Sequence, residues 1–166
     1  MEGSNAPLRD VLIGTAGWSY TDWAGIVYPK PRPKGFHETT YLARYFDTLE
    51  INASFYAAQS ASNAANWVSQ VADNPRFQFT AKLHQSFTHI RNPTDADEHG
   101  FRAMADTLAG ANRLGAVLAQ FPWSFRNTPE SRAYLSAMAE RLRDYPMVVE
   151  VRHSSWDDPA FYDLLR

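Results

Sequence analysis

The stretch Thr48-Leu49-Glu50-Ile51-Asn52-Ala53 decides the fold class. Apolar Leu49 and Ile51 alternate there with polar Glu50 and Asn52. Successive side chains of a β-strand project to opposite faces, so this alternation predicts a strand with one dry face and one polar face. Charged groups are rarely buried without partners. The polar face therefore requires solvent, counter-charges or a ligand.

Four more runs repeat this pattern along the chain: Leu12–Ala16, Phe77–Lys82, Ala116–Phe121 and Met147–Arg152. In three of these runs, polar residues occupy the positions that alternate with the apolar ones. Phe77–Lys82 contains Lys82, Ala116–Phe121 contains Gln120, and Met147–Arg152 contains Glu150 and Arg152. Each polar residue stands near the carboxyl end of its predicted strand. A polar face gathered at strand carboxyl ends is typical of the mouth of a barrel.

Amphipathic helical patterns lie between the strands, with apolar residues three and four apart. Thr128-Pro129 marks a helix start, because threonine caps the first turn and proline has no amide to leave unpaired. The other predicted helices are Glu38–Phe46, Ser62–Ala72, Asp97–Leu114 and Asp158–Arg166. Strand and helix thus alternate five times, which implies a parallel sheet with helical crossovers.

Two sheet architectures fit this order of strands and helices. One is an open doubly wound sheet, complete as it stands; the other is a (β/α)8 barrel, which typically needs about 250 residues. Central strands of open sheets are usually apolar on both faces, whereas these are polar on one. We therefore predict an α/β fold of the TIM-barrel type, a partial barrel of about five βα units. A flexible N-terminus is expected over residues 1–10 and a single domain over residues 11–166.

The composition bounds the function classes. A formal net charge of −2 argues against a broad basic surface for duplex DNA, although a local basic patch stays possible. The absence of cysteine excludes disulfides, thiolate metal sites and a cysteine nucleophile. No apolar stretch approaches the roughly 20 residues of a membrane span, and the start has no secretory pattern. We expect a cytoplasmic protein with no membrane partner.

Five short motifs, in this order and spacing, resemble the YecE-like family, known as domain of unknown function seventy-two. The resemblance covers nearly the whole chain and implies a (β/α)8 barrel, usually with further strands beyond this chain. It implies no settled activity, so it supplies a fold and a site but no reaction. The motifs are Gly14–Tyr20, Glu50–Tyr56, Lys82 with Thr88-His89, Gln120–Phe125 and Glu150–Trp156.

The matched motifs place chemistry-bearing residues at the strand carboxyl ends, where barrels hold their active sites. Glu50 and Glu150 are the acid–base candidates, and Lys82 is a third catalytic candidate. The other candidates would bind a small polar or anionic ligand of the sugar or phosphate type by charge, by hydrogen bonds or by stacking. They are Asn52, Tyr56, His89, Gln120, Arg152, His153, Trp18, Tyr20 and Trp156.

Several alternatives stay open. Glycoside hydrolysis by Glu50 and Glu150 is disfavoured because Lys82 is expected to pair with Glu50, and Arg152 shares the face of Glu150. A Schiff-base role for Lys82 meets the same objection, since a nearby carboxylate favours the charged amine. Dispersed carboxylates and histidines give only a weak metal signal, and the sequence names no cofactor.

Two further alternatives involve no small-molecule chemistry. The charged residues could form a closed polar network that fixes strand register. The aromatic residues that follow strand ends, together with the basic loop around Lys30, Arg32 and Lys34, could serve a nucleic-acid-binding or repair protein. In a partial barrel the first and fifth strands would be open edges, so self-association is also expected.

Overall fold

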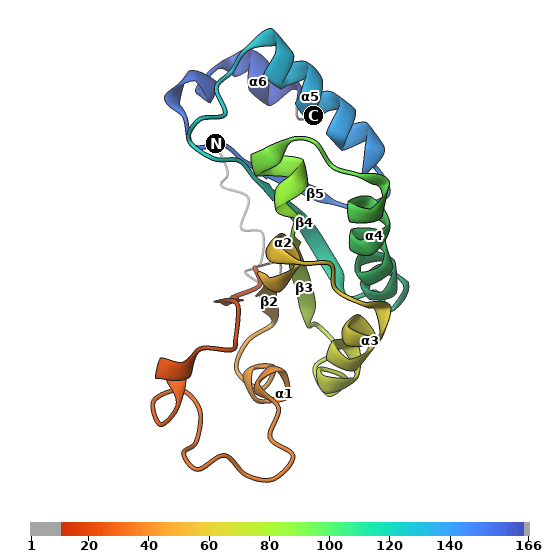
Figure 1. The fold of residues 1–166 in the computed structure, drawn as a ribbon. Helices are drawn as coiled ribbons and strands as arrows, with labels where there is room; N and C mark the ends of the chain where they lie inside the picture. Colours follow the sequence, from red (N-terminus) through yellow and green to blue (C-terminus); the bar gives the residue numbers. More distant parts are fainter. Residues whose placement is uncertain (1–10, 165–166) are drawn as a thin grey trace, which may run out of the picture.

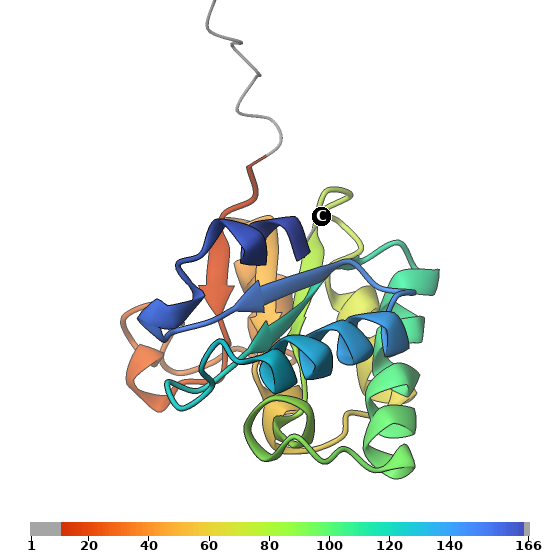
Figure 2. The same cartoon turned by 90° about the horizontal axis from the view of Figure 1, so that it is seen from above.

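Five parallel strands form one sheet in the order β1-β2-β3-β4-β5, each paired with the next along the chain. The computed structural model describes residues 11–164, which form a crescent (Figure 1). Figure 2 shows β1, β2 and β3, coloured red to yellow-green, side by side and pointing the same way. The strands are β1 (Gly14–Ala16), β2 (Thr48–Ile51), β3 (Gln78–Lys82), β4 (Leu114–Gln120) and β5 (Met147–Glu150).

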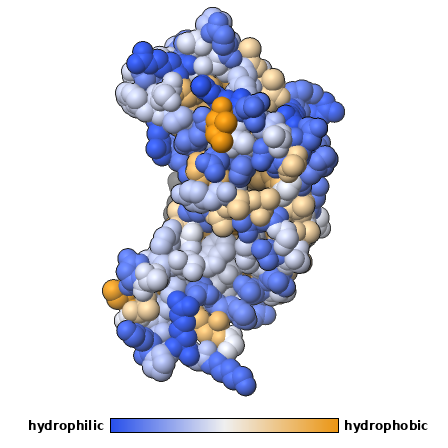
Figure 3. Space-filling model, in the orientation of Figure 1, coloured by the Kyte–Doolittle hydropathy of each residue, from blue (hydrophilic) through white to orange (hydrophobic). Residues whose placement is uncertain are grey.

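The strand order never reverses, so the sheet is singly wound and the doubly wound alternative is not formed. The longer helices α3, α4 and α5 lie on the convex side of the crescent (Figure 1). The space-filling view has the same concave outline, with the hollow on the opposite side (Figure 3). The helices are α1 (Glu38–Leu42), α2 (Ala53–Tyr56), α3 (Ala61–Gln70), α4 (Asp95–Gly110), α5 (Pro129–Arg141) and α6 (Pro159–Leu164).

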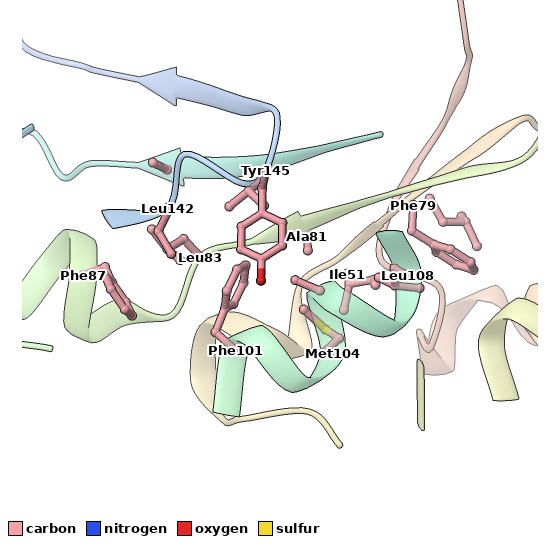
Figure 4. Close-up of a cluster of buried hydrophobic side chains, with 14 of the residues drawn as sticks. Ile51, Phe79, Ala81, Leu83, Phe87, Phe101, Met104, Leu108, Leu142 and Tyr145 are labelled. Atoms are coloured by element: carbon pink, nitrogen blue, oxygen red, sulfur yellow. The ribbon is translucent and has the colours of Figure 1, made fainter. Parts of the chain in front are cut away.

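The predicted alternation of dry and polar faces is confirmed for β2, for β3 and for the second half of β4, where buried residues alternate with partly buried ones. It is not seen in the outer strands β1 and β5, which contain no buried residue. Figure 4 shows side chains of β2 and β3 clustered with those of α4, including Ile51, Ala81, Phe101 and Met104. The core therefore lies between the sheet and the helices, and the polar parity faces the concave side.

Register places the polar residues on a diagonal across the sheet. Glu50 lies opposite Thr80, so Lys82 stands one pleat further along β3 than Glu50 does on β2. Lys82 in turn lies opposite Leu118, one pleat short of Gln120, and Gln120 lies opposite Glu150. A stagger of this kind is what strands tilted around a barrel axis require.

Two of the predicted helix and strand boundaries were wrong. The helix predicted to reach Leu114 stops at Gly110, because Asn112 adopts a left-handed φ of 56° and Leu114 already begins β4. The strand predicted to reach Ala53 stops at Ile51, because the helical turn α2 follows directly. The connection between β3 and α4 contains a π-helical turn over Ser86–Ile90.

Thr128 caps α5 as predicted, its side chain accepting from the Ser131 amide at 3.2 Å with Pro129 in the first turn. We expect Thr128→Ala to lower the free energy of unfolding by about 1 kcal/mol, because the Ser131 amide loses its partner. Urea unfolding followed by circular dichroism measures this. Ser136→Ala on the exposed side of the same helix is the control, and an equal loss in both variants would contradict the capping role.

The two outer strands, β1 and β5, have no second partner strand among residues 11–164. Ile13, just before β1, and Val148, within β5, are exposed to solvent. Unpaired strand edges favour pairing with another chain. Self-association of this chain stays a prediction, and residues 1–10, expected to be flexible, lie outside the described residues.

Candidate functional site

A continuous chain of hydrogen bonds crosses the carboxyl ends of three adjacent strands. The Lys82 ammonium donates to Gln120 Oε1 at 2.6 Å, and Gln120 Nε2 donates to Glu150 Oε2 at 2.7 Å. Arg152 Nε then donates to Glu150 Oε1 at 2.9 Å. Lys82, Gln120 and Glu150 are the last residues of β3, β4 and β5, which is why their side chains meet. We call these four residues the polar row.

Glu50 lies beside the polar row but outside its hydrogen bonds. The expected Glu50–Lys82 pair does not form: no hydrogen bond or ion pair within residues 11–164 reaches the Glu50 carboxyl, and Lys82 turns to Gln120 instead. Partial burial raises the pKa of Glu50 above its usual value, and repulsion from Glu150 adds to this against the opposing pull of Lys82.

Glu150 has the opposite electrostatic character. The hydrogen bond from Gln120 and the one from Arg152 hold the pKa of Glu150 below its usual value. One face of the sheet thus holds two carboxyl groups whose environments push their pKa values apart. That division is the pattern by which active sites separate a proton donor from a fixed carboxylate.

The two carboxyl groups predict stability changes of opposite sign. Because the folded-state pKa of Glu50 is raised, its stabilising contribution is complete below pH 4.5 and is lost as pH rises through the folded pKa. Glu50→Gln should therefore raise the free energy of unfolding at pH 7. Because the folded-state pKa of Glu150 is lowered, Glu150 stabilises the folded protein above its unfolded pKa, and this contribution is lost as pH falls through the folded pKa. Glu150→Gln should therefore lower the free energy of unfolding at pH 7.

Urea unfolding of both variants and the parent between acid and neutral pH measures these changes. Each difference from the parent should shrink towards acid pH, where both carboxyl groups are protonated. A shift of the same sign in both variants at pH 7 would contradict the assigned environments.

Phe55 joins Lys82 and His89 at one side of the row. The Lys82 ammonium lies over the Phe55 ring, 4.7 Å from its centroid, and the His89 ring stands edge-on to it at 4.9 Å. Partial burial and the cations Lys82 and Arg152 lower the pKa of His89, which favours the neutral imidazole. Phe55 was not predicted as a site residue, and its position just after a predicted strand was the only feature of the sequence that pointed to it.

His153 lies at the other side of the row beside an exposed tryptophan. Its Nδ1 accepts from the Ser155 amide at 3.0 Å, so the ring proton is assigned to Nε2. Its ring lies 4.9 Å from that of Trp123, which is 61% exposed and was not among the candidate site residues. With Glu150 and Arg152 these two rings line a hollow of about 680 Å³ along β5.

A second hollow, of about 380 Å³, collects Trp18, Tyr20 and Asn52 near the end of β1. Gly17 shapes it with a left-handed φ of 78°, and a Cβ there would lie 2.6 Å from the Tyr20 hydroxyl. That hydroxyl donates to the Ala16 carbonyl at 2.5 Å. Some of the candidate residues therefore line one of two hollows, Trp18, Tyr20 and Asn52 the one near β1, and Glu150, Arg152 and His153 the one along β5.

Two of the predicted ligand-binding residues, Trp156 and Tyr56, do not lie in the polar row or its hydrogen bonds. Trp156 is 2% exposed, stacks on Phe125 and donates from Nε1 to the Phe125 carbonyl at 2.7 Å, so its indole face is not available for a ligand. The chain turns back after β5 through a short 3-10 helix, Ser154–Trp156, which carries this side chain into the core. Tyr56 is exposed and touches the row only through Phe55.

Within the described part of the chain, no three or more histidine, aspartate or glutamate side chains cluster closely enough to hold a metal ion. The same residues include no helix both long and apolar enough to cross a membrane. The Lys82 amine, hydrogen-bonded to Gln120, is not presented as a free nucleophile.

Fold and site together define an α/β protein with a polar site at the carboxyl ends of a singly wound parallel sheet. The family model described as "Protein of unknown function DUF72" matches residues 12–166, and the chain belongs to this family. The resemblance drawn from the five motifs is thereby confirmed.

Relatives support the same membership. The UPF0759 protein YunF of Bacillus subtilis (strain 168) is 35% identical over 159 residues, which are 92% of this chain and 54% of that protein. A solved DUF72 family protein from Thermotoga maritima MSB8 has 32% identity and a TM-score of 0.71, over 93% of this chain and 60% of that one. Another, from Enterococcus faecalis V583, has 25% identity and a TM-score of 0.63, over 76% and 53%. The chain thus spans about half the length of the curated relative.

Proposed function

We propose that the polar row binds a small anionic ligand, of the phosphate or sugar-acid type, in the mouth of a (β/α)8-type barrel of which these five strands form an arc. The singly wound order, the stagger of the row and the convex helices support the barrel. In such barrels the strand carboxyl ends carry the ligand site. The ligand would lie on the concave side, between the two hollows.

The observation that carries this proposal is the pair of cations at the two ends of one hydrogen-bonded row. Arg152 uses Nε for Glu150, and its two terminal nitrogens make no hydrogen bond within residues 11–164. Its side chain is 52% exposed, so the planar fork can reach a carboxylate or phosphate. The Lys82 ammonium gives one proton to Gln120 and keeps two for a ligand.

Glu50 and Glu150 would have different roles in the site. Glu150 orients Arg152 and stays ionised, whereas the raised pKa of Glu50 makes it the carboxyl group better suited to take up a proton. Protonation of Glu50 would remove a negative charge from the site as the anion arrives. Asn52, His89 and His153 would orient the ligand with hydrogen bonds.

A thermal-shift screen tests the proposal with inorganic phosphate and with phosphorylated and carboxylated sugars. We expect saturable stabilisation of the parent by at least one of these anions and its loss in Arg152→Gln. The control is Arg143→Gln, at an exposed position just after α5, which removes the same charge and leaves the row intact. Equal stabilisation of both variants would overturn the assignment of the site.

A second candidate is single-stranded nucleic acid, favoured by the exposed Trp123 beside His153 and the Arg152 fork. A base could stack on the indole while Arg152 meets a phosphate. This function predicts fluorescence-anisotropy binding of an oligothymidylate that weakens steeply with salt and is lost in Trp123→Ala. No binding at low salt would reject it.

A further inference from the structure

A recessed hollow of about 250 Å³ lies away from the polar row, between the α2 turn and the start of α4. Its apolar wall is made by Phe101 and Met104 of α4, with Ala58 and Ala96 at the sides. Phe101 and Met104 are buried and belong to the core (Figure 4). Drug-sized ligands usually occupy about 300–1,000 Å³, so this hollow suits a smaller molecule.

Four polar side chains also line this hollow: Ser54, Gln59, His84 and Asp97. Ser54 is fully occupied, because its hydroxyl contacts the carbonyls of Ile51 at 2.8 Å and Lys82 at 2.6 Å. It ties the α2 turn to the end of β3 and is not available to a ligand.

The Asp97 carboxylate is also satisfied by the protein. Its Oδ2 accepts from the Thr94 amide at 2.8 Å and the Thr94 hydroxyl at 2.9 Å, and its Oδ1 lies 3.7 Å from His84 Nδ1. The Thr94 bonds hold the pKa of Asp97 below its usual value. The hollow therefore contains a fixed negative charge that needs no ligand cation and that repels anions.

One donor and one acceptor remain. His84 Nδ1 accepts from the Ser86 amide at 3.3 Å, so the ring proton is assigned to Nε2, which has no acceptor among residues 11–164. Gln59 uses Nε2 for the Ala57 carbonyl at 3.0 Å and leaves Oε1 without a donor in that same range. An apolar wall with one donor and one acceptor is the usual make-up of a small-molecule site.

We propose that this hollow is a second small-molecule site, for a neutral one-ring molecule that carries a hydroxyl or a primary amide. The ring would lie between the exposed Ala58 and Ala96, above the buried Phe101 and Met104, and the polar group would accept from His84 Nε2 and donate to Gln59 Oε1. The hollow and the groups that line it do not depend on the function proposed for the polar row.

Saturation-transfer NMR with phenol and benzamide on the whole chain tests this site. The parent should bind at least one of them saturably, and benzoate about tenfold more weakly or not at all, because its carboxylate meets Asp97. Gln59→Met should weaken phenol binding about threefold to tenfold through loss of the acceptor.

Ala96→Phe, at an exposed position on α4, should fill the hollow and abolish binding, whereas Ala103→Phe on an exposed position of the same helix should leave it unchanged. No saturable binding of either probe to the parent, or undiminished binding to Ala96→Phe, would overturn the proposal. A circular dichroism spectrum and a urea unfolding midpoint like those of the parent provide a separate check that Ala96→Phe is folded.

Discussion

Phe79→Ala is expected to lower the free energy of unfolding by about 3–5 kcal/mol. Phe79 is fully buried on β3, the middle strand of the sheet, where its ring lies 5.1 Å from that of Phe77 and 6.4 Å from that of Trp67. Truncation would leave a cavity between the sheet and α3 that rigid strands cannot close. Urea unfolding followed by circular dichroism measures the loss.

Tyr56→Ala is the matched control, because its ring is exposed and should change stability by only about 0.5 kcal/mol. If Phe79→Ala does not fold, Phe79→Leu should still fold with a loss under about 1.5 kcal/mol, since it fills most of the volume. A loss below about 1 kcal/mol in the alanine variant would contradict the position of the core.

Lys82→Met is expected to weaken binding of the stabilising anion about 10- to 100-fold. The substitution removes one cation from the site and the hydrogen bond that ties β3 to Gln120, and hydrogen bonds to charged groups contribute about 1.5–3 kcal/mol. The methionine keeps contact with the Phe55 ring, so the local packing should persist. Isothermal titration calorimetry measures the change in Kd.

The control for this variant is Lys30→Met in the proline-rich loop, which removes the same charge far along the chain from the row. If long-range electrostatic attraction alone held the anion, both variants would bind it equally weakly. The loss of affinity relative to the parent would then become smaller as the salt concentration rises. An unchanged Kd in Lys82→Met would place the anion elsewhere on the molecule.

The polar row could be predicted from the sequence because side-chain direction in a strand has a period of two residues. This period assigned Glu50, Lys82, Gln120, Glu150 and Arg152 to one face. This period does not specify which residues of neighbouring strands lie opposite one another, however. The predicted partner of Lys82 was therefore wrong: Glu50 and Gln120 each lie one pleat from Lys82 on its two neighbouring strands, and the Lys82 ammonium donates to Gln120.

The short elements and the electrostatics could not be predicted in the same way. The turn α2 and the π-helical turn that carries His89 are too short for an apolar period, yet they bring Phe55 and His89 together. Trp156 follows a strand end like the exposed aromatics, but packing decides that it is buried. The opposite pKa shifts of Glu50 and Glu150 depend on burial and on partners from other strands.

Lys82 at the end of β3 and Arg152 just after β5 are expected to contact the same anion. Heteronuclear NMR of the side-chain nitrogens during a phosphate titration measures binding at both groups at once. We expect the Lys82 and Arg152 signals to shift together with a single Kd, while Lys34 in the exposed loop stays unchanged. Shifts that follow different affinities at Lys82 and Arg152, or that are no larger than those of Lys34, would contradict it.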